Sequence, residues 1–161
     1  MANTRSILLK ARLGLVRRDL EDILGKLTPE LLPWAPAEGM RTISGQLVEI
    51  VATELQLIAL LKRGEHISDE AAAEIIGDCG NLENLRRAVS DFRQQTLDYL
   101  DSLSEAELAE EVPFDGGWLA SLTLPTIPRA EVFLNIADHE WYHVGQLTSY
   151  LWARGEDPYS W

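Results

Sequence analysis

The 161 residues are enough for one domain, and their 46% hydrophobic and 25% charged content is ordinary for a globular protein. The formal net charge of −12 argues against nucleic-acid binding, because phosphate recognition requires clustered lysine and arginine. The same charge disfavours anionic membrane surfaces. We therefore expect a single domain over residues 1–161 that binds neither nucleic acid nor membrane.

Cysteine content and the N-terminal sequence bear on the compartment. The one cysteine, Cys79, excludes an internal disulfide and fits a reducing environment. The N-terminal segment is broken by charges, and no apolar run reaches the roughly 18 residues of a membrane span. These features predict a cytoplasmic protein. The pairs Arg17–Arg18 and Arg86–Arg87 are isolated and are expected on solvated helix faces.

Apolar residues recur at three- and four-residue steps in four long segments, and this spacing predicts amphipathic helices. The segments span residues 4–26, 42–63, 82–102 and 128–154. In the first segment the apolar stripe includes Ile7 and Leu8. Four such helices joined by shorter elements predict an all-α bundle with short extra helices in the connections.

The connections carry turn and capping signals. Pro29 indicates a short helical turn, and Ser68 is a candidate N-cap of a short helix. Ser104 and Glu107 have the spacing of a capping box. Segment 112–127 is interrupted by glycine and proline and is predicted to be irregular, since no alternating strand pattern stands out.

The last long helix contains two of the three histidines, His139 and His143. Successive helical residues turn by about 100°, so the two histidines lie about 40° apart on the apolar stripe, and Gln146 falls near them. Side chains at i and i+4 begin about 5–6 Å apart, so two imidazoles can converge on one metal ion. Histidines that hydrogen-bond within the core explain the pattern as well, and the pattern alone does not identify a third ligand.

The letters "HEWYH" also match H-E-x-x-H, the pattern in which a glutamate, here Glu140, acts as general base of a zinc protease. We do not expect a protease. A small helical bundle offers no strand to hold a peptide, and only 18 residues follow His143 in the sequence.

Two stretches resemble a known family. The stretch "HEWYHVGQLTSYLWARGEDP" resembles the last helix of the DinB/YfiT-like superfamily, whose members carry H-x-x-x-H followed by G-Q-[LI]. The stretch "RTISGQLVEIVATEL" is similar to that family's second helix, in which a glutamate follows a histidine by five residues. The resemblance implies an up-down four-helix bundle, usually a homodimer, with one divalent metal held by one histidine of the second helix and two of the last.

Carried over to this chain, the resemblance implies that His139 and His143 are metal ligands and that Glu49 stands where the family has its second-helix histidine. The consequence is either a two-histidine, one-carboxylate site for Zn, Ni, Mn or Fe, or loss of the metal. Glu54 matches the family's glutamate and lies at the centre of its apolar stripe, so it needs a partner. It is the third ligand, a partner of a ligating imidazole, or ion-paired with an arginine such as Arg129.

The activities that the resemblance implies act on a small molecule. One is a metal-dependent S-transferase with a low-molecular-weight thiol as cosubstrate, and the other is a hydrolase that uses metal-activated water. No residue is assigned a catalytic role beyond the metal ligands. The alternative, motivated by the missing second-helix histidine, is a metal-free dimeric helical bundle with a binding or structural role.

Overall fold

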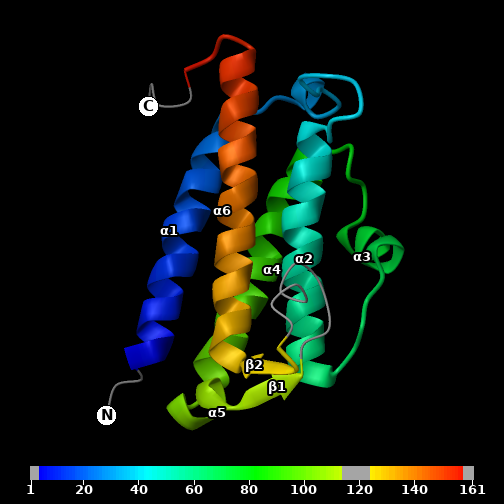
Figure 1. Cartoon of the computed structure of the whole chain (residues 1–161). Coiled ribbons are helices and arrows are strands. Elements are labelled where there is room, and N and C mark those ends of the chain that lie inside the picture. Colours follow the sequence, from blue (N-terminus) through cyan, green and yellow to red (C-terminus); the bar gives the residue numbers. More distant parts are fainter. Residues whose placement is uncertain (1–3, 114–123, 158–161) are drawn as a thin grey trace.

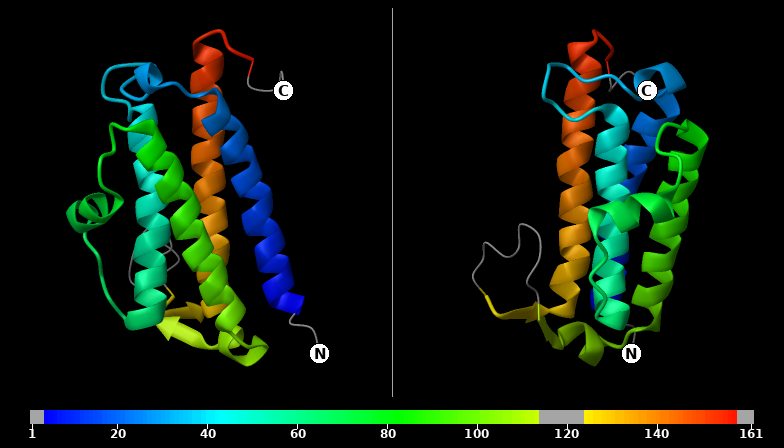
Figure 2. Two further views of the ribbon diagram at one scale, coloured as in Figure 1. Left: turned by 180° about the vertical axis from the view of Figure 1, so that it is seen from behind. Right: turned by 90° about the vertical axis from the view of Figure 1, so that its right-hand side faces the viewer.

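The computed structural model describes residues 4–113 and 124–157. Four long helices form a bundle, and short elements connect them (Figure 1). The long helices are α1 (Thr4–Lys26), α2 (Ile43–Arg63), α4 (Leu82–Ser102) and α6 (Arg129–Ala153). The predicted all-α four-helix bundle with short extra helices in its connections is confirmed. The helix directions follow the order up, down, down, up and not a strict up-down alternation, because the long connection after α2 returns the chain before α4 begins (Figures 1 and 2).

The helices α1 and α6 run in one direction, and α2 and α4 run in the other (Figures 1 and 2). The connection that contains α3 (Asp69–Ile76) returns the chain to the end where α2 begins, so α2 and α4 are parallel. Accordingly, the Tyr99 hydroxyl near the end of α4 donates to the Leu61 carbonyl near the end of α2. Gln46 at the start of α2 instead meets Tyr150 near the end of α6.

Local capping signals position the helix starts. The side chains of Thr42 and Ser68 accept backbone N–H bonds at the starts of α2 and α3. Ser104 and Glu107 form the predicted capping box at α5 (Glu105–Ala109). Hydrogen bonds between Glu107 and Ser104 lower the pKa of the Glu107 carboxyl.

The segment 112–127, predicted to be irregular, contributes residues to two strands. Two short strands, β1 (Glu111–Pro113) and β2 (Thr126–Pro128), pair antiparallel at the end of the bundle where α6 begins. Three-residue strands are too short to show an alternating pattern in the sequence. Residues 114–123 of the predicted irregular segment lie outside the described residues. The turn predicted at Pro29 is the 3-10 helix η1 (Pro29–Leu31).

The buried stripe of α1 differs from the predicted one. Ile7 and Leu8 are 55% and 62% exposed, whereas Leu9, Leu13 and Val16 are buried. Leu9, Leu13 and Val16 follow one another at steps of four and three, and this row faces the bundle. Ile7 and Leu8 precede Leu9 by about 200° and 100° of rotation, so they lie on other sides of the helix.

Helix α2 has a mean hydropathy of 1.4 over its most apolar window, and by length and composition it could cross a membrane. In the bundle, half of that window is buried, and α2 contacts both α4 and α6. The core position of α2 accounts for its apolar composition.

Four charged side chains, one from each long helix, meet in the middle of the core. They are Arg17, Glu54, Arg93 and Glu140, here called the buried ion-pair cluster, and none is more than 6% exposed. Arg17 Nε donates to Glu140 Oε1 at 2.8 Å, and Arg93 Nε donates to Glu54 Oε1 at 2.7 Å. Arg17 also bonds Glu54, and Arg93 also bonds Glu140. On every long helix the cluster lies between the residues of the two hydrophobic clusters.

The buried ion-pair cluster corrects two predictions. Arg17 is in the core and not on a solvated face, because two buried carboxylates require two cations for neutrality. The partners of Glu54 are Arg17 and Arg93, not Arg129. Arg129 lies at the far end of the bundle, where it pairs with Glu110. The position of Glu54 on the apolar stripe of α2 indicated that this carboxylate needs a partner. Which residue is the partner depends on how the helices pack, and this could not be predicted from the stripe.

Candidate metal centre

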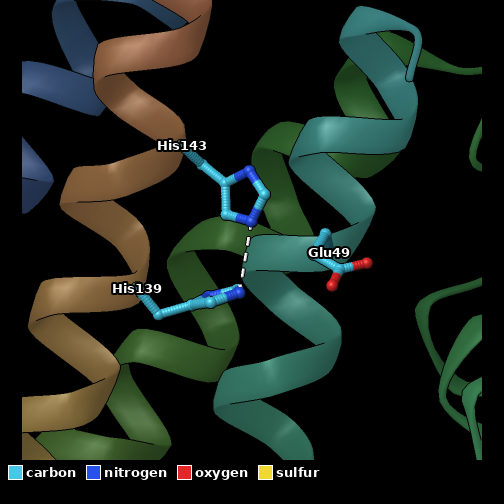
Figure 3. A group of neighbouring side chains, drawn as sticks. All are labelled: Glu49, His139 and His143. Atoms are coloured by element: carbon cyan, nitrogen blue, oxygen red, sulfur yellow. Dashed lines mark hydrogen bonds between the residues drawn. The ribbon is translucent and has the colours of Figure 1, made fainter. Parts of the chain in front are cut away.

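Two histidines of α6 and one glutamate of α2 converge in the groove between these helices (Figure 3). The Nε2 atoms of His139 and His143 are 3.2 Å apart. One potential ligand atom from each of His139, His143 and Glu49 lies within 4.8 Å of the other two. Both rings reach from α6 toward α2, so the structure brings the three predicted ligands together.

The spacing of the two nitrogens fits a shared ion. Two Nε2 atoms 3.2 Å apart can both lie about 2.0–2.1 Å from one ion, the usual distance between zinc and an imidazole nitrogen. A third ligand in such a site is often a carboxylate, and Glu49 has a carboxylate oxygen within 4.8 Å of the histidine ligand atoms. The residues present therefore fit a divalent transition metal.

A hydrogen-bond chain orients the ring of His143. Its Nδ1 donates to the Oε1 atoms of Gln46 and Gln146, the latter at 3.1 Å. Gln46 Nε2 donates to the Tyr150 hydroxyl at 3.3 Å, and that hydroxyl donates to the Arg41 carbonyl at 2.9 Å. Because carbonyl oxygens only accept, the proton of His143 resides on Nδ1, and the Nε2 lone pair is left for an ion. The expected approach of Gln146 to the site is confirmed.

The candidate ligands line a pocket of about 590 Å³. Its lining residues are Arg41, Glu49, Asp138, His139, Tyr142 and His143. The Arg41 Nη1 atom lies 2.8 Å from Glu49 Oε2, with the two side chains 47% and 40% exposed. This volume is within the range of small-molecule sites, so the pocket admits a ligand beside the histidines.

Both histidines are neutral at pH 7. Burial lowers the pKa of His139 to about 4, and the positive charge of Arg41 acts in the same direction. The pKa of His143 is also lowered to about 4, by burial first and then by His139, while Glu49 opposes the shift. Neutral imidazole is the form that binds metal ions, so protons do not compete for these ligands near neutral pH.

A comparison with protein families shows to which family the chain belongs. A model described as the DinB superfamily matches residues 12–147. The chain belongs to the DinB superfamily. No curated protein matches the sequence. The matched region contains Glu49, His139 and His143, so the possible metal site lies wholly within the part of the chain that the family model matches.

Two acidic residues that the sequence brought into consideration lie outside the candidate metal site. Glu54 and Glu140 are each bonded to Arg17 and Arg93 in the buried ion-pair cluster. Glu140 follows His139 directly, and successive helical side chains point about 100° apart, so it turns into the core. The letters H-E-x-x-H therefore occur here without a glutamate placed as general base.

Three residues around the candidate metal site were not predicted from the sequence. Gln46 precedes Glu49 by one helical turn, a spacing that could have indicated a shared face. Tyr142 packs edge-on against the His143 ring, with centroids 5.3 Å apart. Arg41 precedes the first turn of α2, and its approach to Glu49 depends on the path of its side chain, which no pattern indicates.

The metal-free protein should lose stability as the pH falls from about 6.5 toward 4. His139 and His143 have a pKa of about 4 when folded and an ordinary value of 6.5 when unfolded. Between these values the unfolded chain binds more protons, so lowering the pH favours unfolding, and above about 6.5 the effect is absent. Urea denaturation in a chelator at several pH values measures it. The double variant His139→Ala, His143→Ala should lack this contribution to the dependence of the unfolding free energy on pH. An unchanged pH dependence in the double variant would contradict the prediction.

Proposed function

We propose that this protein holds one divalent transition metal ion with Glu49, His139 and His143 and uses it to activate a low-molecular-weight thiol. The observation that carries the proposal is the pair of Nε2 atoms 3.2 Å apart, beside a carboxylate, in the wall of a pocket. Zinc is the first ion to test, and Ni, Mn and Fe also suit two imidazoles and a carboxylate.

The bound ion would lower the pKa of a thiol that reaches it, so that thiolate forms at neutral pH. The chain's own residues prepare the site. Gln46 fixes the tautomer of His143, and burial keeps both imidazoles neutral. Glu49 contributes a negative charge, and the pocket gives room for a small second substrate.

Thiol transfer is favoured over hydrolysis by the position of Glu140. In H-E-x-x-H hydrolases the glutamate takes a proton from the attacking water. Here Glu140 is 1% exposed and bonded to two arginines. Forming a thiolate needs only the loss of the thiol proton, which a metal ion promotes.

The test uses two reactions with zinc-loaded and chelated protein. The first is arylation of N-acetylcysteine by 1-chloro-2,4-dinitrobenzene, in which sulfur bonds to the ring carbon while chloride leaves and the thiol proton goes to solvent. The second is hydrolysis of 4-nitrophenyl acetate. Zinc-dependent acceleration of the first alone supports the proposal, and acceleration of the second alone supports a hydrolase. The substitution Cys79→Ser removes the protein's own thiol from both assays.

A metal-free binding protein is the second candidate. It is favoured by one observation, that the site is satisfied without an ion, since His139 and His143 bond each other and Arg41 pairs with Glu49. We also propose that the protein is a cytoplasmic homodimer. Dimerisation is supported by large apolar side chains that are exposed on α1 and α6, namely Ile7, Leu8, Leu15, Trp141, Tyr142 and Trp152. Sedimentation velocity would test the oligomeric state.

A further inference from the structure

The side chain of Arg41 is part of the pocket wall although the residue lies outside α2. Its Nη1 atom pairs with Glu49, and its side chain is 47% exposed. A guanidinium carries five N–H donors in a planar fork, so a single contact through Nη1 leaves donors for a ligand. Arginine in this position suits a planar oxyanion, because the fork matches a carboxylate.

A glycine makes room for this path of the Arg41 side chain. A Cβ atom at Gly45 would lie only 2.7 Å from Arg41 Cγ and 3.2 Å from Thr42 Oγ1. The Arg41 side chain therefore crosses the first turn of α2 at Gly45, and the Cβ atom of any other residue at position 45 would displace it. Gly145 on α6 is different, because a Cβ there meets nothing within 4 Å.

The charges around the pocket make anion binding depend on the metal. Of the lining residues, Arg41 is positive and both Glu49 and Asp138 are negative, so with neutral histidines the wall has a formal charge of −1. A divalent ion changes this to +1. The α2 N-terminus does not add an anion site, since its first N–H groups are bonded within the protein, those of Ile43 and Ser44 to the carbonyls of Trp34 and Leu32.

We infer that Arg41 binds the carboxylate of a small anionic substrate whose other end reaches the ion held by Glu49, His139 and His143. This inference rests on the proposed metal site and narrows its substrate class to small carboxylates. Arg41 is then a specificity-determining residue. The ligand can be short, because Arg41 touches Glu49 and a ligand atom of Glu49 lies within 4.8 Å of the histidine ligand atoms.

The experiment compares two short thiols on cobalt(II)-substituted protein. The probes are 3-mercaptopropionate and 2-mercaptoethanol, of which the first carries a carboxylate where the second carries a hydroxyl. The thiolate-to-cobalt absorption band reports the binding of each thiol. The unaltered protein should bind 3-mercaptopropionate about tenfold more tightly, as expected for one charge-assisted pair. Arg41→Ala and Gly45→Ala should lose most of this preference and bind 2-mercaptoethanol as before. The controls Arg18→Ala, at an exposed arginine, and Gly145→Ala should keep the preference.

Four results would overturn the inference, and they differ in whether the proposed metal site also fails. If cobalt does not bind to the unaltered protein, the metal site and this inference both fail. If cobalt binds but the two thiols have equal affinity, only the carboxylate specificity fails. If Arg41→Ala keeps the preference, the ion alone attracts the carboxylate. A purely structural role of Arg41, holding Glu49, would weaken both thiols alike and likewise contradicts the inference.

Discussion

Replacing Arg93 with methionine should lower the free energy of unfolding by about 3–5 kcal/mol. Arg93 is 5% exposed and bonds Glu54, Glu140 and the carbonyl of Leu13. Its removal leaves two buried carboxylates with the single cation Arg17, and an unpaired buried charge is the costly state. For a domain of this size the melting temperature should fall by roughly 6–20 °C.

A second variant separates charge imbalance from lost packing. Combining Arg93→Met with Glu54→Leu removes one cation and one anion. Arg17 and Glu140 would remain as a neutral pair, with contacts of 2.8 and 3.1 Å. The double variant should therefore be more stable than Arg93→Met alone. Urea denaturation measures both, and Arg87→Met, at an exposed position of α4, should change stability by no more than about 0.5 kcal/mol. A double variant less stable than the single one would contradict the charge-balance explanation.

Zinc should stabilise the protein, and the paired substitutions His139→Ala and His143→Ala should abolish the effect. Free ion at 100 times its dissociation constant adds about 2.7 kcal/mol, which is roughly 5–10 °C in melting temperature. The two alanines remove both nitrogens that lie 3.2 Å apart, and Glu49 alone cannot hold the ion. Thermal unfolding with zinc and with chelator measures the difference.

The third histidine supplies the matched control for that experiment. His66 lies in the connection after α2, outside the group of potential ligands. His66→Ala should keep the full zinc effect. An equal rise in melting temperature for the double-alanine variant would place the ion elsewhere and contradict the proposed site.

The long helices and the histidine pair could be predicted because their signals are local. Apolar spacing, the Ser104–Glu107 capping box and the i, i+4 placement of His139 and His143 all lie within short segments. The same periodicity placed Glu54 among apolar residues and so indicated a buried carboxylate. Glu49 came from the resemblance to the DinB superfamily, since no spacing relates a residue on α2 to two on α6.

What could not be predicted depends on contacts between distant segments. Arg17 looks like a surface residue because Arg18 follows it, and only the packing of four helices places it beside Glu54 and Glu140. The route of Arg41 over Gly45 depends on the angle at which the chain enters α2. The pairing of β1 with β2 joins segments too short to have a pattern of their own.

The most direct test of the metal centre is its stoichiometry. The protein should be purified without a histidine tag, reconstituted with zinc, freed of excess ion and measured by elemental analysis, beside Glu49→Ala. About one equivalent per chain in the unaltered protein, lost or strongly reduced in the variant, is the predicted result. Full retention in Glu49→Ala would remove Glu49 from the ligand set. No metal in either protein would contradict the site and leave His139 and His143 as hydrogen-bonded residues of a binding protein.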